Sequence, residues 1–207
     1  MFLSSGAVTM ATDIDWEIYG GRALGSFVDM AMRWLWIGAV VLLAGCSGVP
    51  QGLHPVSGFD ADKYLGHWYE IARLDHSFER GLSDVTADYR KLPDGRIEVI
   101  NRGFDAKKNK WNEAKGVARF QGKPDVASLE VSFFWPFYGA YNVLVLDPQY
   151  RYAMVAGPNR NYLWILARDR QLDQGTLDIL VERARTFGFA TDALIYVEHK
   201  NTPIMVD

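Results

Sequence analysis

Runs of alternating apolar and polar residues, each of strand length, occupy most of the chain after Lys63. Along 84–91 and 128–134, apolar residues alternate with mostly polar ones. A period of two places one face of a strand against a core and the other face in water. The runs recur about every ten to twelve residues, which is typical of a sandwich or an up-and-down barrel. The predicted strands cover residues 64–73, 84–91, 96–104, 111–121, 128–134, 140–147, 150–157 and 161–168.

The last three of these strands are apolar on both faces, so something must cover their outer side. Residues 173–187 can supply that cover, because their apolar side chains recur at helical spacing. Asp173 is a suitable N-cap for this helix and Gly188 a suitable stop. We expect the helix to pack against the outer wall of the last strands. A ninth strand at 193–198 is expected to pair at the barrel seam.

The apolar segment at 35–43 is followed by Leu43-Ala44-Gly45-Cys46. The segment is too short to span a bilayer, and its layout is that of a secretory signal. The four residues resemble the bacterial lipobox, in which the cysteine is lipidated and becomes the new N-terminus after cleavage. The resemblance implies that Cys46 carries the lipid. Because Ser47 follows, it also implies sorting to the outer membrane.

The residues before Met32 are acidic, whereas a secretory signal begins with a short basic region. We therefore expect translation to start at Met30 or Met32. The segment after Cys46 has the composition of a flexible tether. The expected organisation is a removed leader at 1–45, a lipidated tether at 46–57, a barrel domain at 58–200 and a tail at 201–207.

Composition removes several classes of function. The net charge is −3, charged residues make up 23% of the chain, and no long run of one sign occurs, so nucleic acid is not an expected partner. The single cysteine excludes an internal disulfide and a site built from cysteine ligands alone. Aromatic residues make up 14%, which suits half-buried strand surfaces.

Three separated motifs resemble the lipocalin family. The first strand carries Gly66-His67-Trp68, which resembles a Gly-x-Trp signature. Asp147-Pro148-Gln149-Tyr150 resembles a Thr-Asp-Tyr signature, with Pro148 as a departure, and Arg168 ends the eighth strand where lipocalins carry an arginine. Longer stretches are similar to bacterial outer-membrane lipocalins related to apolipoprotein D. The resemblance implies an all-β fold, an eight-stranded antiparallel up-and-down lipocalin barrel with one C-terminal helix outside and a ninth strand.

The same resemblance gives Gly66, Trp68, Asp147, Tyr150 and Arg168 structural roles, with the indole closing one end of the barrel and the guanidinium packed across it. The odd-numbered strand connections then lie at the open mouth, where we expect Arg80, Trp135, Phe137, Tyr138 and Arg160. Period-two counting predicts an inner, ligand-binding face with a cavity, since Gly116 and several alanines are small. The predicted ligand-binding residues are Glu70, Ala72, Tyr89, Asn101, Ala118, Phe120, Val131, Phe133, Tyr141, Val143, Met154, Tyr162 and Trp164.

No constellation of residues predicts catalysis or a metal, and no cofactor is expected. The four histidines are scattered along the chain, with none paired at ligand spacing. Glu70 is the one inward-facing carboxyl that the pattern identifies. We expect Glu70 to form a hydrogen bond with Tyr89 or Asn101 rather than to act as a general acid.

The leading expectation is a non-enzymatic carrier, anchored through Cys46 to the outer membrane of a Gram-negative bacterium and facing the periplasm. Its ligand would be a fatty acid, a lysophospholipid or a similar amphiphile held in the barrel. Two alternatives stay open, a lipid-modifying enzyme on the same barrel and a structural envelope lipoprotein with a filled core. The identity of the lipid and the existence of a homodimer are also open.

Overall fold

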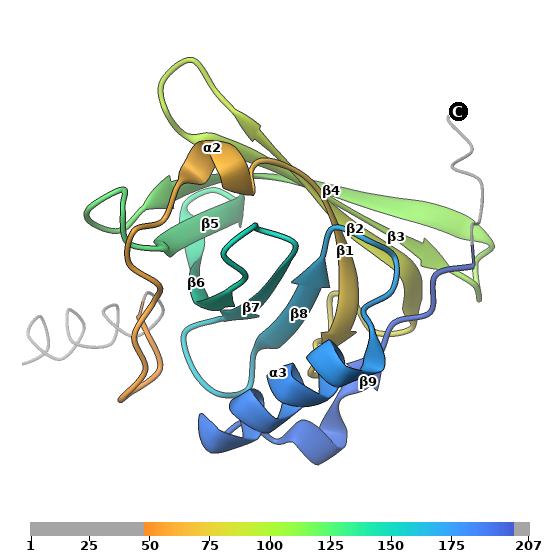
Figure 1. The fold of residues 1–207 in the computed structure, drawn as a ribbon. Coiled ribbons are helices and arrows are strands. Elements are labelled where there is room, and N and C mark those ends of the chain that lie inside the picture. The colour runs from red at the N-terminus through yellow and green to blue at the C-terminus, as the bar shows by residue number, and fades with distance from the viewer. Residues whose placement is uncertain (1–47, 201–207) are drawn as a thin grey trace, which may run out of the picture. The chain divides into compact units, whose positions relative to one another are not determined.

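The computed structural model describes residues 48–200, which form an antiparallel barrel with a helix on its outside (Figure 1). Strands β2 to β8 pair in sequence order, and β1 pairs with both β2 and β8, which closes the barrel. The predicted leader, Cys46 and the tail lie outside the described residues. The barrel strands are β1 (Gly66–Arg73), β2 (Leu82–Lys91), β3 (Ile97–Asp105), β4 (Lys110–Phe120), β5 (Ser128–Phe134), β6 (Phe137–Leu146), β7 (Tyr152–Ala156) and β8 (Leu163–Ala167).

The remaining elements lie before and after the barrel strands. A short helix, α2 (Ala61–Tyr64), precedes β1, and its N-cap Asp60 accepts hydrogen bonds from two backbone amides. Helix α3 (Gln174–Thr186) follows β8, with Asp173 as its N-cap. A 3-10 turn, η1 (Thr191–Ala193), leads into β9 (Ile195–Tyr196), which pairs antiparallel with β1. The predicted eight-stranded barrel, outer helix and ninth strand are confirmed, whereas α2 was not predicted.

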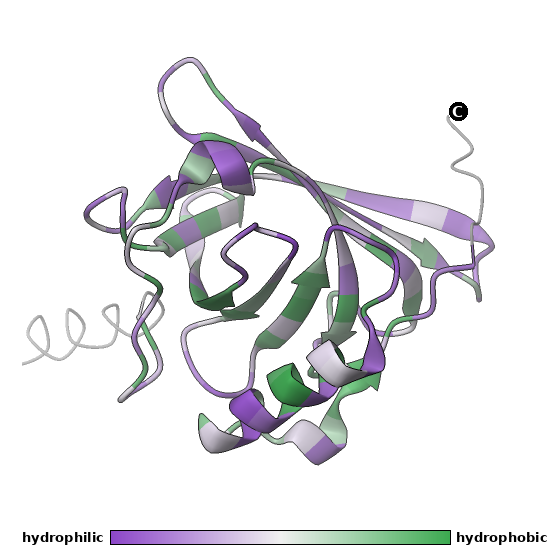
Figure 2. Cartoon of the chain, viewed as in Figure 1, coloured by the Kyte–Doolittle hydropathy of each residue, from purple (hydrophilic) through white to green (hydrophobic). Residues whose placement is uncertain are grey.

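Apolar side chains form two layers, one inside the barrel and one between the barrel and α3. Figure 2 shows that β7 and β8 are apolar along their length. Their side chains alternate between the layers, since Ala153 and Val155 point inward while Met154 packs outward. Leu180 and Ala184 of α3 complete the outer layer. The helix therefore covers the strands that the sequence identified as apolar on both faces.

Register shifts interrupt four of the strand pairs, β1–β8, β2–β3, β5–β6 and β6–β7. The pairing of β1 with β8 slips between Glu70 and Ala72, and the pairing of β6 with β7 slips between Val143 and Val145. A bulge inserts one residue into a strand and changes the face of every residue beyond it. Ala72 consequently lies in the outer layer. Its predicted inward position was wrong, and so was that of Met154, because strict period-two counting cannot locate a bulge or choose between two apolar faces.

Candidate functional site

The closed end of the barrel is held by Trp68 and Arg168. The indole is fully buried, its Nε1 donates to the Tyr64 carbonyl at 2.8 Å, and the Arg168 Cζ lies 4.0 Å from the ring centre. The guanidinium also donates at 2.8 Å to the carbonyls of Lys63, Leu65 and His67. One side chain thus ties α2 to the start of β1 and the end of β8.

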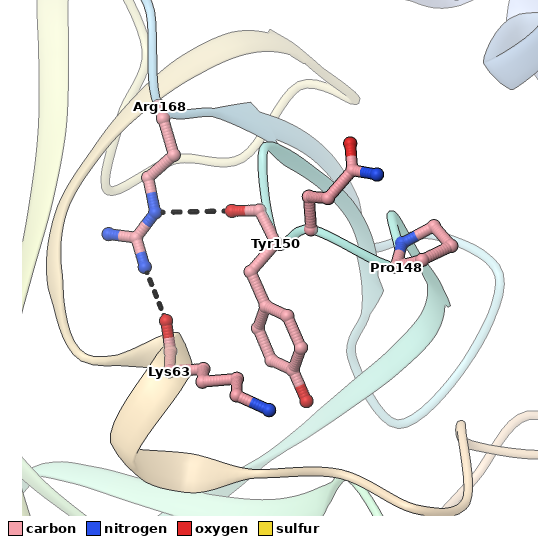
Figure 3. Close-up of a pocket in the computed structure, with 5 residues that line it drawn as sticks. Lys63, Pro148, Tyr150 and Arg168 are labelled. Atoms are coloured by element: carbon pink, nitrogen blue, oxygen red, sulfur yellow. Dashed lines mark hydrogen bonds between the residues drawn. The ribbon is translucent and has the colours of Figure 1, made fainter.

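The β6–β7 turn joins the same base. The Asp147 carboxylate accepts from the Gln149 amide and from the backbone and side chain of Arg151, and these bonds hold its pKa below the ordinary value. The Tyr150 hydroxyl accepts from the Asp60 amide at 2.8 Å. Figure 3 shows Tyr150 and Arg168 beside Lys63 in a surface hollow. Because the polar groups of this turn are hydrogen-bonded to one another and to neighbouring backbone, we interpret this end of the barrel as structural.

Above the base, three phenols form a polar floor inside the barrel. The Tyr141 hydroxyl lies 2.7 Å from that of Tyr64 and 2.9 Å from that of Tyr89. Burial raises the pKa of all three groups, so each hydroxyl stays protonated and can both donate and accept. Tyr141 is therefore tied into the packed part of the interior.

Most of the predicted lining belongs to the inner layer. Val131, Phe133 and Trp164 are only partly buried there, although they share this layer with fully buried neighbours. A Cβ on Gly116 would lie 2.8 Å from the Phe133 ring, so that ring occupies the space that the small residue was expected to leave empty. The other predicted residues in this layer are Tyr89, Ala118, Phe120, Tyr141 and Val143.

A buried ionic cluster lies where β1 reaches the mouth. The bulge at Ile71 brings Arg73 beside Glu70, and the Arg73 Nη1 donates to the Glu70 carboxylate at 2.7 Å with both side chains almost wholly buried. The Arg73 Nη2 donates to the carbonyls of Glu79 and Leu82 at 2.8 and 3.3 Å. Glu70 therefore has Arg73 as its partner, and neither Tyr89 nor Asn101 fills the role that the sequence assigned to them.

The connection between β1 and β2 folds inward onto this cluster. The Glu79 carboxylate accepts from the Trp164 indole at 3.0 Å. His76 packs against Phe78, Tyr162 and Trp164, with ring centres 4.7 to 5.3 Å apart. Neither ring nitrogen of His76 has a hydrogen-bond partner, and the Asn101 Oδ1 and Arg73 Nε are also unpaired.

The charge of the cluster is set by burial. Desolvation and the neighbouring Glu79 charge raise the pKa of Glu70 to about 8, and burial raises the pKa of Glu79 as well. Burial, with Arg73 nearby, lowers the pKa of His76 to about 4. The carboxyl pair consequently retains a proton at neutral pH while His76 is uncharged. Sequence reasoning missed Arg73 and did not group His76 and Glu79 with Glu70, because only the bulge and the folded connection bring these residues together.

Of the residues expected at the mouth, some are bonded to other protein groups and others are exposed to solvent. The Arg80 Nε donates to the Asp75 carboxylate at 2.9 Å, and Arg160 donates to the carbonyls of Phe187 and Gln51 at 2.7 and 2.8 Å. Tyr138 lies under the Arg119 guanidinium at 4.4 Å from the ring centre. Trp135 and Phe137, by contrast, are 83% and 77% exposed.

Within residues 48–200 there is no group of three or more histidine, cysteine or acidic side chains that could hold a metal ion. In the same range, no helix is long and apolar enough to cross a membrane. The described site has an apolar inner barrel face, with a buried polar cluster of Glu70, Arg73 and Glu79 toward the mouth. That arrangement can bind an amphiphile.

Known proteins resemble this chain over most of its length. A model of the lipocalin-like domain matches residues 59–199. The outer membrane lipoprotein Blc of Vibrio cholerae is 52% identical over 161 residues, which cover 77% of this chain and 94% of that protein. Blc of Escherichia coli K12 is 46% identical, covering 77% and 92%. Apolipoprotein D of Macaca fascicularis is 32% identical, covering 78% and 93%.

Solved structures agree on the fold. Insecticyanin from the tobacco hornworm Manduca sexta aligns with a TM-score of 0.59 at 19% identity, covering 74% of this chain and 88% of that one. The cockroach allergen Per a 4 aligns with a TM-score of 0.58 at 18% identity, covering 74% and 95%. Identities this low speak for the barrel architecture alone.

Proposed function

The chain belongs to the lipocalin-like family, and from this premise we propose that its barrel binds a fatty acid, a lysophospholipid or a similar amphiphile. The observation that supports the proposal is the gradient of burial inside the barrel. Val143 and Val155 are fully buried, whereas Val131, Phe133 and Trp164 on the same inner face remain half-buried. A core filled by its own side chains would bury both groups equally.

Burial of an acyl chain supplies the binding energy in this proposal. Each buried methylene contributes about 0.8 kcal/mol, so a chain of some 14 carbons gives about 10 kcal/mol before the costs of ordering and desolvation. The hydrocarbon would lie against Val131, Phe133 and Trp164. The head group would lie toward the mouth, where the polar atoms without partners gather.

We propose further that the protein is anchored by lipid at Cys46 in the outer membrane, facing the periplasm. The lipobox-like sequence supports this location, as do two relatives at 46% and 52% identity that are named outer membrane lipoproteins. Several acyl chains on one cysteine give the stable anchoring that a single chain does not. Cys46→Ser should move the protein from the membrane pellet to the periplasmic fraction. A variant that stays in the pellet after a salt wash would contradict the anchor.

A lipid-modifying enzyme on this barrel is the main alternative. The buried groups of the site are committed to one another, since Arg73 is bonded to Glu70 and Trp164 to Glu79. No nucleophile is bonded to His76, whose ring nitrogens have no hydrogen bond and whose Nε2 lies 3.7 Å from a Glu79 carboxylate oxygen. Binding without turnover is therefore the function that these groups favour.

Competition binding tests the ligand class. The delipidated Cys46→Ser chain should bind one fluorescent fatty acid per barrel. Palmitate, palmitoyl lysophospholipid and monopalmitoylglycerol, which share one acyl chain, should each displace it. Displacement by none of the three would contradict the proposal, and hydrolysis of the lysophospholipid would favour the enzyme.

The mouth is proposed to prefer an anionic or zwitterionic phosphate head group. Because Asp75 occupies the Arg80 guanidinium, a ligand phosphate must compete with it. Asp75→Asn frees Arg80 and should strengthen lysophospholipid binding several-fold, without strengthening monoacylglycerol binding. Arg80→Glu should have the opposite selectivity. Equal changes for both lipids would remove Arg80 from head-group recognition.

A further inference from the structure

The tip of the β5–β6 hairpin exposes an unusual set of side chains. Phe134, Trp135 and Phe137 are 80%, 83% and 77% exposed, and they lie next to one another at the turn between the strands. Phe78, on the β1–β2 connection, is 63% exposed. Both connections are odd-numbered, so they lie at the end of the barrel opposite Trp68. Among residues 48–200, four of the five large exposed aromatic side chains thus lie at the mouth, and the fifth is Tyr196 of β9 at 56% exposure.

Exposed aromatic clusters are costly in water and usually mark an interaction surface. The hairpin tip is a projecting turn rather than a groove, so it fits a deformable partner better than a shaped one. Trp and Phe side chains partition favourably into the interface between lipid head groups and acyl chains. The tip therefore has the chemistry and the shape of a bilayer contact.

The tether supports the same partner by its position. The Asn142 side chain of β6 donates to the Gly48 carbonyl at 3.0 Å, and Arg160 in the β7–β8 connection donates to the Gln51 carbonyl. Residues 48–51 consequently run beside the connection at the mouth. Asn142 is five residues along β6 from Phe137, a separation of about 17 Å.

Cys46 is two residues before Gly48, so the covalent chain limits their separation to about 7 Å. If Cys46 carries the lipid, the anchor is joined to a tether that is bonded at Gln51 to the β7–β8 connection, which is at the same end of the barrel as the aromatic tip. The membrane that holds the anchor is then within reach of the tip. Lys107 and Lys110 border the β3–β4 connection at the same end, where they can face anionic lipids.

We propose that the hairpin tip at 134–137 inserts into the bilayer interface as a second membrane contact and turns the barrel mouth toward the lipid. This inference rests on the proposed lipid anchor, which fixes the bilayer at this end. It adds an orientation that the anchor alone does not give. An amphiphile could then pass between the bilayer and the barrel without crossing the aqueous periplasm.

Vesicle binding without the anchor tests the contact. The full chain carrying Cys46→Ser is mixed with vesicles of phosphatidylethanolamine and phosphatidylglycerol, and bound protein is measured by cosedimentation. Replacing Phe134, Trp135 and Phe137 together by serine should lower the partition coefficient on the order of tenfold. Ile179→Ser is the matched control, because Ile179 is 71% exposed on α3, outside the hairpin tip, and its loss should change nothing.

Three outcomes would overturn the proposal. The first is equal binding by the parent, the triple variant and the Ile179→Ser control, and the second is no binding by the parent. The third is a dimer of the parent in gel filtration that the triple variant abolishes, since the tip would then bind a second copy of the chain. Trp135→Ser alone, with a smaller loss, keeps the test valid if the triple variant misfolds. Failure of the anchor is read separately, by fractionating the triple variant with and without Cys46→Ser. The variant that keeps Cys46 should stay in the membrane pellet, and the one that lacks it should move to the periplasmic fraction.

Discussion

The two ends of the barrel differ in how completely their aromatic and polar side chains are buried and bonded. At the base, Trp68 is fully buried and Arg168 uses its guanidinium on backbone carbonyls and on the indole face. At the mouth, His76 is buried without a hydrogen bond, and Trp135 is exposed without cover. Unpaired buried polar atoms and exposed aromatic rings both raise the free energy of the folded state. The contrast indicates that the base supplies stability and the mouth supplies function.

The largest expected effect comes from removing the base. Trp68→Ala should destabilise the protein by about 3 to 5 kcal/mol, because it opens a cavity and frees the Tyr64 carbonyl. Urea unfolding of the Cys46→Ser chain measures this loss. Ligand affinity should fall only as far as the folded fraction falls. A Trp68→Ala protein of unchanged stability would show that the base does not carry the fold.

At the mouth, Arg73→Met should cost about 3 to 5 kcal/mol at pH 8, since it leaves Glu70 buried without its cation. The cost should shrink at pH 5, where Glu70 is protonated. Adding Glu70→Leu to Arg73→Met should recover most of the loss, because an apolar pair replaces the ion pair. A double variant no more stable than the single one would contradict the assignment of the cost to Glu70.

The pH dependence of stability separates the groups within the cluster. Glu70 has a folded pKa of about 8 against an ordinary value of 4.5, so its contribution is full below pH 4.5 and is lost as pH rises toward 8. His76 has a folded pKa of about 4 against 6.5, so its contribution is lost as pH falls through that range. The two contributions to stability change in opposite directions between pH 4.5 and 6.5. Above pH 6.5, the stability contribution of His76 no longer changes, whereas that of Glu70 still falls.

The free energy of unfolding should therefore decline from pH 6.5 to pH 8, by at most about 1.4 kcal/mol per pH unit for one proton. Glu70→Gln should flatten this decline, and His76→Gln should make it begin at lower pH. Urea melts across the range give the slopes. A decline that Glu70→Gln leaves intact would place the proton on another group.

The smallest expected effects distinguish Tyr141, in the polar floor, from Trp164, on the half-buried inner face. Tyr141→Phe removes a hydroxyl bonded to two phenols and should cost about 1 to 2 kcal/mol of stability with little effect on binding. Trp164→Phe keeps an aromatic wall but loses the bond to Glu79, and should weaken amphiphile binding more than it weakens folding. Unfolding and displacement titrations on both variants decide this. If Tyr141→Phe weakened binding more than folding and Trp164→Phe weakened folding more than binding, Tyr141 would be the ligand contact and Trp164 the structural residue.

The same contrast explains what the sequence could predict. Alternation, helical spacing and the motifs around Trp68 and Arg168 predicted the barrel, the outer helix and the ninth strand, because these depend on local periodicity and local partners. The mouth cluster depends on a one-residue bulge beside Glu70 and on the inward fold of the connection carrying Glu79. Neither has a local signal, so Arg73 was missed and Ala72 was placed inside. The two-sided apolar pattern of β7 likewise left the face of Met154 undetermined.

Analysis by mass spectrometry of the lipid that co-purifies with the Cys46→Ser chain tests the central claim most directly, because that chain has no anchor of its own. The account predicts one amphiphile with a single acyl chain per barrel. It also predicts that delipidated protein takes up one equivalent again and that Trp164→Phe protein retains less. Protein that purifies free of lipid and takes up none after delipidation would show that the barrel is filled by its own side chains.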